Sequence, residues 1–149
     1  MPTEPARPPF DFDSKKLILQ FQSTIPADTR EISPVVEGVM ALVNQMGCAV
    51  GKEFEVETAL REALANAIIH GAKKDPTKKV QFCVSCDESR GMLVVVRDPG
   101  DGFDPAKIAA PVVGQELFST HGRGIYLINQ MVDEVRFEKG GTEIHMVVR

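Results

Sequence analysis

The sequence predicts an α+β fold, a two-layer sandwich in which a mixed, mostly antiparallel sheet is covered by helices on one face. Two observations predict it. Segments with a two-residue hydrophobic period are mostly joined in pairs by short turns, as antiparallel strands are. The segments with a helical period cluster instead of alternating with single strands, which disfavours a doubly wound parallel sheet. The chain has 149 residues, enough for one domain with one sizeable core.

The first element is expected after a proline-rich N-terminal stretch. Residues 1–14 resist regular hydrogen-bond ladders because proline has no backbone donor, so we expect a flexible tail there and a folded domain over residues 15–149. Leu17, Leu19 and Phe21 alternate with Gln20 and Gln22, which predicts a strand with one buried face. Pro26 is expected to end this strand.

Two helices are predicted next. Ser33 is a candidate N-cap and is followed by Pro34 at the first helical position, while Gly47 is a plausible stop. Residues 52–73 carry an apolar stripe at helical spacing that closes near Gly71.

The second half of the chain predicts strands around a long loop. Residues 80–84 alternate and residues 93–96 form a continuous apolar run, with a hairpin turn expected over residues 86–91. Residues 98–120 are irregular and rich in Gly, Pro and Asp, and long internal loops are more often functional than accidental.

A short helix is expected after Gly124, followed by two strands. Hydrophobic residues alternate around residues 135–137 and 144–148, with a turn at Gly140 and Gly141.

Charge and composition restrict the classes of partner. With 17 Lys+Arg and 21 Asp+Glu the net charge is −4, so there is no broad cationic field and direct nucleic-acid binding is disfavoured. No apolar run approaches the ~18 residues that span a bilayer, and the N-terminus lacks the apolar core of a signal peptide, so we expect a cytoplasmic protein without a membrane partner.

Cys48, Cys83 and Cys86 are therefore expected to be reduced thiols, and zinc at Cys83 and Cys86 is disfavoured because no second Cys pair exists.

Glu62 and Asn66 form the first candidate for chemistry. They lie four residues apart on the second predicted helix and are therefore neighbours on its surface. In phosphoryl transfer, Glu62 would accept the proton of an attacking hydroxyl and Asn66 would offer its side-chain oxygen to Mg²⁺. The alternative is an ordinary solvated helix face.

Two glycine-rich segments supply the other candidates. Asp98 follows a buried strand and can accept a hydrogen bond from the exocyclic amine of adenine, while Gly100 and Gly102 let the backbone turn around the ring. The alternative is a Gly-rich surface turn. Gly122 and Gly124 lead into a helix whose free backbone N–H groups can cradle phosphate, although neither a Walker A loop nor a Rossmann fingerprint is present.

In this order, the motifs resemble those of the GHKL ATPase superfamily, and within it the bacterial anti-sigma-factor serine kinases. The resemblance covers about residues 15–149. The N box is similar to residues 60–71, the first glycine box to residues 96–105, the second to residues 122–135, and the closing glycine-threonine pair to Gly141-Thr142.

The resemblance implies a Bergerat-type ATP site that also holds Mg²⁺. Glu62 would be the catalytic base, Asn66 the Mg²⁺ ligand, and Asp98 the reader of the adenine amine, with Gly100 and Gly102 beside the base. The further residues expected to contact the nucleotide are Ser119, Thr120, Gly122, Arg123, Gly124 and Thr142.

The resemblance also implies a homodimer and two protein partners. The chain would phosphorylate a serine or threonine of an anti-anti-sigma (STAS-type) protein. It would also sequester a sigma factor and so regulate transcription. The segment before Gly122 is shorter than the ATP lid of the sporulation-type kinases, which favours a second hypothesis. In it, the chain is a nucleotide-responsive switch with little or no kinase activity. A third is an isolated catalytic domain of the histidine-kinase type.

Overall fold

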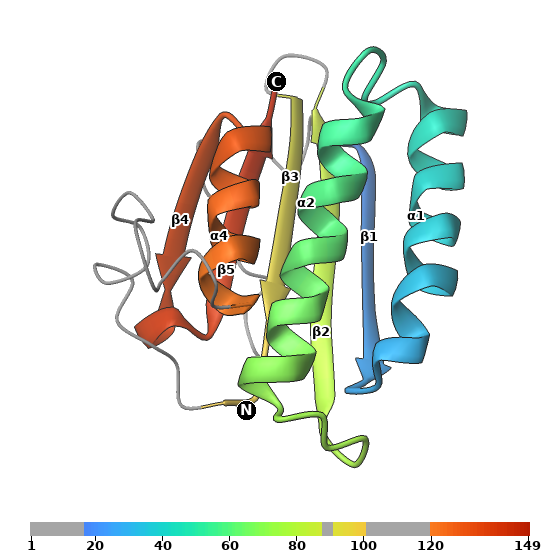
Figure 1. Cartoon of the computed structure of the whole chain (residues 1–149). Helices are drawn as coiled ribbons and strands as arrows, with labels where there is room; N and C mark the ends of the chain where they lie inside the picture. Colours follow the sequence, from blue (N-terminus) through green and yellow to red (C-terminus); the bar gives the residue numbers. More distant parts are fainter. Residues whose placement is uncertain (1–16, 88–90, 101–119) are drawn as a thin grey trace.

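A single antiparallel sheet carries the fold. The structure is a computed structural model, and it describes residues 17–87, 91–100 and 120–149. Within these residues five strands form one sheet in the order β1-β2-β3-β5-β4, with every neighbouring pair antiparallel. Helices α1, α2 and α4 all lie over the same face of this sheet (Figure 1). The predicted α+β sandwich is confirmed.

The helices and strands follow the chain in the expected order. The strands are β1 (Leu17–Pro26), β2 (Lys79–Asp87), β3 (Gly91–Arg97), β4 (Glu134–Glu138) and β5 (Glu143–Val148). The helices are α1 (Ile32–Met46), α2 (Glu53–Asn66) and α4 (Thr120–Met131), with short turns η2 (Thr29–Glu31), η3 (Ala67–Gly71) and η5 (Lys139–Gly141). Among the described helices, none is long and apolar enough to cross a bilayer.

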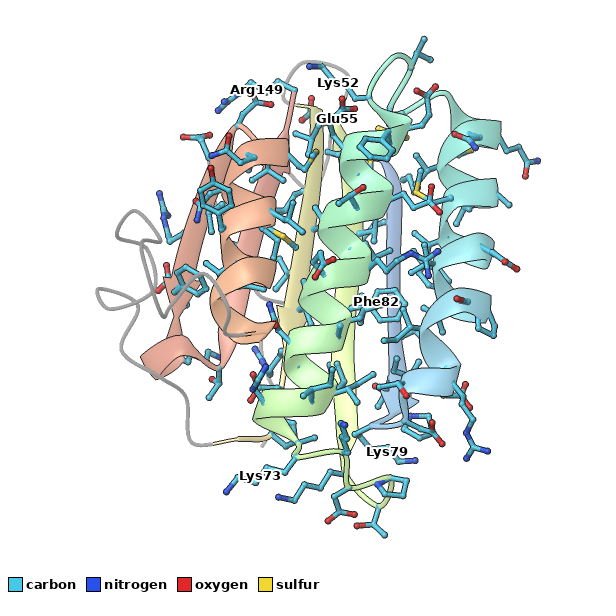
Figure 2. All side chains as sticks on the ribbon, in the orientation of Figure 1. Lys52, Glu55, Lys73, Lys79, Phe82 and Arg149 are labelled. Carbon is cyan, nitrogen blue, oxygen red and sulfur yellow. A yellow bond between two sulfur atoms is a disulfide. The ribbon has the colours of Figure 1, made fainter. Side chains whose placement is uncertain are left out.

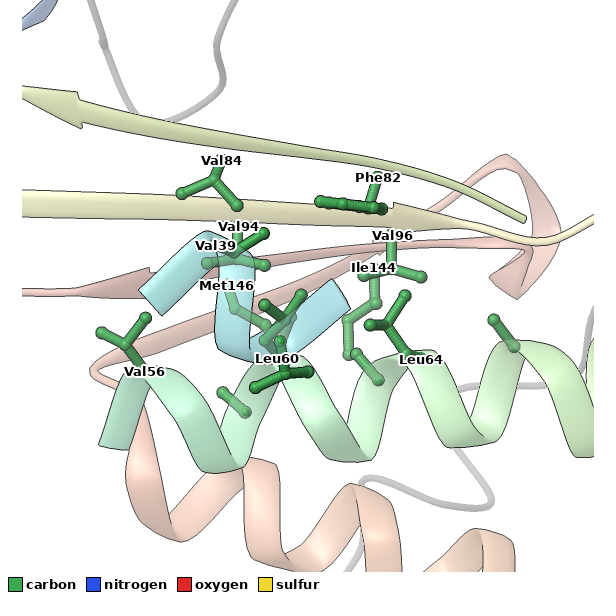
Figure 3. Packing of buried hydrophobic residues seen from close by; sticks show 14 of the residues in the cluster. Val39, Val56, Leu60, Leu64, Phe82, Val84, Val94, Val96, Ile144 and Met146 are labelled. Carbon is green, nitrogen blue, oxygen red and sulfur yellow. The ribbon is translucent and has the colours of Figure 1, made fainter. Parts of the chain in front are cut away.

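The core lies between α2 and the middle of the sheet. Leu60 and Leu64 project from α2 and are fully buried, as the helical stripe predicts. They pack towards side chains on the facing strands, including Val94 and Met146 (Figure 3). Burying a side chain of this size contributes about 1.5–3 kcal/mol, so this contact fixes how α2 sits on the sheet.

The start of α1 differs from the prediction. The helix begins at Ile32, and the side chain of Ser33 does not cap it. Instead, Asp28 caps the preceding turn η2, where Oδ1 accepts a hydrogen bond of 2.9 Å from the N–H of Arg30. The predicted stop is confirmed, because Gly47 ends α1 with a φ of 68°.

Three further boundaries differ. The second predicted helix ends as an α-helix at Asn66, and η3 continues it as a π-helical turn. The predicted hairpin turn starts too early, because β2 runs to Asp87 before β3 begins at Gly91. Helix α4 begins at Thr120, so Gly124 lies inside it and not before it.

The prediction that all three cysteines are reduced is wrong. Cys48, just after α1, and Cys86, on β2, are joined by a disulfide whose Cα atoms lie 5.9 Å apart. Cys83 is free and lies on the opposite face of the same strand, as residues three apart on a strand do. The prediction failed because disulfide pairing depends on which cysteines the fold brings close together. Neither the number of cysteines nor a leader sequence indicates which cysteines are close.

Candidate functional site

A cavity opens between the C-terminal half of α2, the middle of α4 and the ends of β3 and β5. Its volume is about 350 Å³, and ligand pockets span roughly 300–1,000 Å³. Its polar side chains come from Asn66, His70, Lys73, Lys78, Asp98 and Thr142. Its larger apolar side chains come from Val96, Ile125, Phe137 and Ile144. A cavity of this kind suits a flat apolar group that also carries polar edges.

Asp98 holds one end of the cavity. It directly follows β3, and its N–H donates to the carbonyl of Thr142 over 2.9 Å, which ties it to the start of β5. The N–H of Gly100 donates to Oδ1 of Asp98 over 2.7 Å. Among the described residues nothing donates to Oδ2. Burial raises the pKa of Asp98, and the Gly100 N–H offsets this only in part. Asp98 therefore offers Oδ2 as a free hydrogen-bond acceptor at a position partly shielded from water.

Two glycines allow η3 to pack closely against the turn at Asp98. A Cβ on Gly71 would collide with the carboxyl group of Asp98, and a Cβ on Gly100 would collide with the carbonyl oxygen of Gly71. The backbone of η3 therefore touches the Asp98 turn directly. Gly100, which we predicted from the sequence, and Gly71, which falls inside the N-box resemblance, both matter here because they lack a side chain.

Asn66 and Glu62 lie at the other end, against α4. A Cβ on Gly124 would stand only 2.8 Å from Nδ2 of Asn66 and 3.2 Å from Oε2 of Glu62. The missing side chain of Gly124 therefore lets α4 approach the polar side of α2. Glu62 is partly buried but does not line the cavity, whereas Asn66 does.

The amide of Asn66 is incompletely paired. Its Nδ2 atom is buried and has no hydrogen-bond partner among the described residues. A buried polar atom without a partner is costly, which makes Asn66 a candidate for a functional role. A 180° flip of the side-chain amide would place Oδ1 where Nδ2 now lies.

The π-helical turn η3 was not foreseen. Such turns are rare and occur often at functional sites. Here the turn brings Ala67, His70 and Gly71 into the cavity wall. Burial, and to a smaller extent the charge of Lys74, lowers the pKa of His70. No hydrophobic period distinguishes one π-turn from the end of an α-helix, so the sequence carried no signal for it.

Two lysines in the wall were also missed. Lys73 and Lys78 line the cavity, and Figure 2 labels Lys73 just beyond the lower end of α2. Lys73 and Lys74 both have positive φ, 54° and 58°, which costs a non-glycine residue of order 1 kcal/mol. Their place in the wall depends on contacts between distant segments, which a run of charged residues does not report.

The remaining candidates for nucleotide contact are described only in part. Gly102 and Ser119 lie outside the described residues, and for Thr120, Gly122 and Arg123 the structure describes the backbone alone. That backbone is the first turn of α4. The first four N–H groups of a helix have no partner within it, so this end can accept an anion.

Thr142, which we expect to contact the nucleotide, lies in the wall beside Asp98. Its hydroxyl donates to the carbonyl of Lys139 over 2.9 Å, so the hydroxyl oxygen is left as an acceptor. In the described part of the chain, no group of three or more His, Cys, Asp or Glu side chains is placed to hold a metal ion.

The sequence that carries these residues matches a known family. The family model described as a histidine kinase-like ATPase domain matches residues 25–148. The chain belongs to this family. Within it, the similarity to curated proteins lies with the anti-sigma kinases of the GHKL superfamily.

Three relatives illustrate this similarity. An anti-sigma F factor of Bacillus cytotoxicus is 32% identical over 120 residues, covering 72% of this chain and 77% of the relative. The serine-protein kinase RsbW of Bacillus subtilis is 27% identical over 120 residues, covering 76% and 74%. An anti-sigma F factor of Priestia megaterium is 28% identical over 106 residues, covering 67% and 69%.

Proposed function

We propose that this chain binds ATP in the cavity and transfers its γ-phosphate to a serine or threonine of a small regulatory protein. The observation that carries the proposal is the convergence of Asp98 and Asn66 on one cavity, each packed closely against a glycine. Three motifs that are far apart in the sequence thereby form one site with a base-binding end and a phosphate-binding end.

The base-binding end is at Asp98. With Oδ1 occupied by the Gly100 N–H, Oδ2 is the acceptor for the exocyclic amine of adenine. Val96 and Ile144 supply an apolar floor for the ring, and the hydroxyl oxygen of Thr142 is a further acceptor. This arrangement favours adenine over guanine, because guanine presents a carbonyl where adenine presents its amine.

The phosphate-binding end is at Asn66, Gly124 and the first turn of α4. The free N–H groups of that turn and the positive end of the helix dipole attract the triphosphate. Asn66 would hold Mg²⁺ through Oδ1, in keeping with the preference of this ion for oxygen ligands. When bound, Mg²⁺ neutralises charge on the transferring phosphate.

Glu62 is the proposed catalytic base. Its Oε2 lies close to the position that a side chain of Gly124 would occupy, next to the amide of Asn66. From there it would accept the proton of the attacking hydroxyl, while Asn66 and the backbone of α4 hold the phosphate in line.

The proposed partners follow from the names of the relatives. One is called a serine-protein kinase and two are called anti-sigma F factors. We propose that this chain likewise phosphorylates a STAS-type anti-anti-sigma protein and sequesters a sigma factor, acting in the cytoplasm without binding nucleic acid itself. The folded unit is proposed to be residues 15–149, and the homodimer is a prediction that size-exclusion chromatography with light scattering tests.

One observation favours a second function. Glu62 does not line the cavity, although Asn66 beside it does. If Glu62 is not brought to the γ-phosphate, the chain binds nucleotide and changes its affinity for a partner without phosphorylating it. This is the nucleotide-responsive switch.

A phosphotransfer assay separates the two functions. Purified chain is incubated with Mg²⁺, γ-labelled ATP and each small regulatory protein encoded beside its gene. The kinase predicts label on one partner, and a loss of transfer of about 10²-fold or more in Glu62→Ala with nucleotide binding intact. Glu57→Ala is the matched control, because Glu57 lies on the same helix but pairs with Arg61 outside the cavity. Full transfer by Glu62→Ala contradicts the assigned base, and nucleotide-dependent partner binding without transfer supports the switch.

A further inference from the structure

A charged network lies on the face of the sheet opposite the helices. The Nε atom of Arg97 is 2.6 Å from Oε2 of Glu143, and the Nε2 atom of His145 is 2.6 Å from Oε1 of the same carboxylate. Lys139 approaches Oε2 to 3.7 Å. Arg97 and Glu143 are also direct partners in the β3–β5 ladder, and His145 follows two residues along β5. One carboxylate therefore joins the ends of two strands.

This carboxylate is buried and charged. Glu143 is 4% exposed and His145 is 7% exposed. Burial alone raises the pKa of Glu143, but the hydrogen bonds and charges of Arg97 and His145 outweigh it and hold the pKa below its ordinary value. Removing such a group from water costs several kcal/mol, and apolar replacements of buried ion pairs are often as stable or more so. Net stability is thus a poor explanation for this network.

The network lies directly behind the base-binding end of the cavity. Successive side chains of a strand point to opposite faces, so Val96 and Ile144 face the cavity while Arg97 and Glu143 face away. Arg97 immediately precedes Asp98, and Glu143 immediately follows Thr142. The hydrogen bond from the Asp98 N–H to the Thr142 carbonyl continues the ladder by one step beyond the Arg97–Glu143 pair.

We propose that Glu143, through its pairing with Arg97, is a positioning residue that holds Asp98 and Thr142 at the separation required to bind the nucleotide base. The inference rests on the proposed nucleotide site. Without the pair, the ends of β3 and β5 lose the ion pair that joins their side chains on this face and keep the backbone hydrogen bonds of the ladder. The last bonds of a ladder open most readily, and the Asp98 turn moves with them. Glu143 touches no ligand and acts only through the strand ends.

The test compares binding with stability. Affinity for Mg-ADP is measured by calorimetry, and the free energy of unfolding by urea titration. Glu143→Gln is expected to bind Mg-ADP about tenfold more weakly, the size of effect seen when a supporting partner of a binding group is removed. Arg97→Lys, which keeps the charge but loses the guanidinium geometry, is expected to weaken binding in the same direction.

The double variant Arg97→Met/Glu143→Leu separates positioning from simple stabilisation. Replacing both charges with apolar side chains is expected to restore the free energy of unfolding to the wild-type value or above, while the affinity for Mg-ADP stays low. Glu134→Gln is the matched control. It breaks the Arg149–Glu134 ion pair at the opposite end of the β4–β5 ladder and should leave the affinity unchanged.

The outcomes are distinguishable. Wild-type affinity in Glu143→Gln, or in the double variant, overturns the positioning role while leaving the nucleotide site intact. Weaker binding in Glu134→Gln as well overturns it too, because the effect would then not be specific to the base-binding end. Failure of the wild-type chain to bind Mg-ADP contradicts the proposed function itself. If Glu143→Gln does not fold, Arg97→Lys and the double variant give the same comparison.

Discussion

The substitution Gly124→Ala tests the site, because it should change the free energy of unfolding and the affinity for nucleotide by different amounts. In Gly124→Ala the new Cβ stands 2.8 Å from Nδ2 of Asn66, whereas comfortable contacts begin near about 3.5 Å. Asn66 or α4 must therefore retreat by roughly 0.7 Å. Overpacking of this kind costs about 1–3 kcal/mol, and the better helix propensity of alanine returns about 1 kcal/mol. We expect a net loss of stability of about 0–2 kcal/mol.

Binding should suffer more than stability. The retreat displaces Asn66 and Glu62 from the phosphate-binding end, so we expect the affinity for Mg-ADP to fall by about tenfold or more. Calorimetry and urea titration measure the two quantities. The matched control is Gly38→Ala in α1, where a Cβ meets nothing within 4 Å. It should stabilise the fold by about 0.5–1 kcal/mol and leave binding unchanged. Wild-type affinity in Gly124→Ala would refute the proposed packing of α4 against the site.

The remaining predictions concern Asp98 and the disulfide. In Asp98→Asn, Oδ1 still accepts the Gly100 N–H, but the free atom becomes an NH₂ donor facing the adenine amine, so calorimetry should detect no Mg-ADP binding. Because burial raises the pKa of Asp98 in the fold, its charge opposes folding at neutral pH and this opposition is relieved as the pH falls below that pKa. Urea titration at pH 7 should therefore find the Asn variant at least as stable as the wild type, and a clear loss of stability would contradict this. Removing the Cys48–Cys86 disulfide, which closes a 38-residue separation, should cost up to about 4 kcal/mol, measured by urea titration with and without reductant. Cys83→Ala should leave that difference unchanged, and a reductant-independent stability would contradict the bond.

Sequence analysis predicted the fold through its periodic segments. The stripe on α2 and the apolar run of β3 depend on which residues face a core, and this shows directly as hydrophobic spacing. Asp98 could be proposed from the sequence, because a carboxylate at the end of a buried strand is recognisable in the chain. The start of α4 was placed late at Gly124, because glycine was taken as a helix boundary where it instead permits close packing against Asn66.

Other features depend on contacts between distant segments, and no local pattern reports them. The collision that a side chain on Gly71 would make with Asp98 exists only once η3 meets the end of β3. The Cys48–Cys86 bond likewise depends on the approach of the α1–α2 connection to β2. The place of Lys73 in a cavity wall likewise depends on how the segment after α2 meets the strand ends, and composition does not report it.

The most direct test of the central claim is thermal unfolding of the whole chain with Mg-ADP. A ligand that binds only the folded state at 100 times its dissociation constant adds about 2.7 kcal/mol of stability. For a domain of this size, that raises the Tm by roughly 10 °C. We predict such a rise for the wild type and none for Asp98→Asn. An unchanged wild-type Tm at millimolar Mg-ADP, or an equal rise in Asp98→Asn, would contradict an adenine-nucleotide site in this cavity.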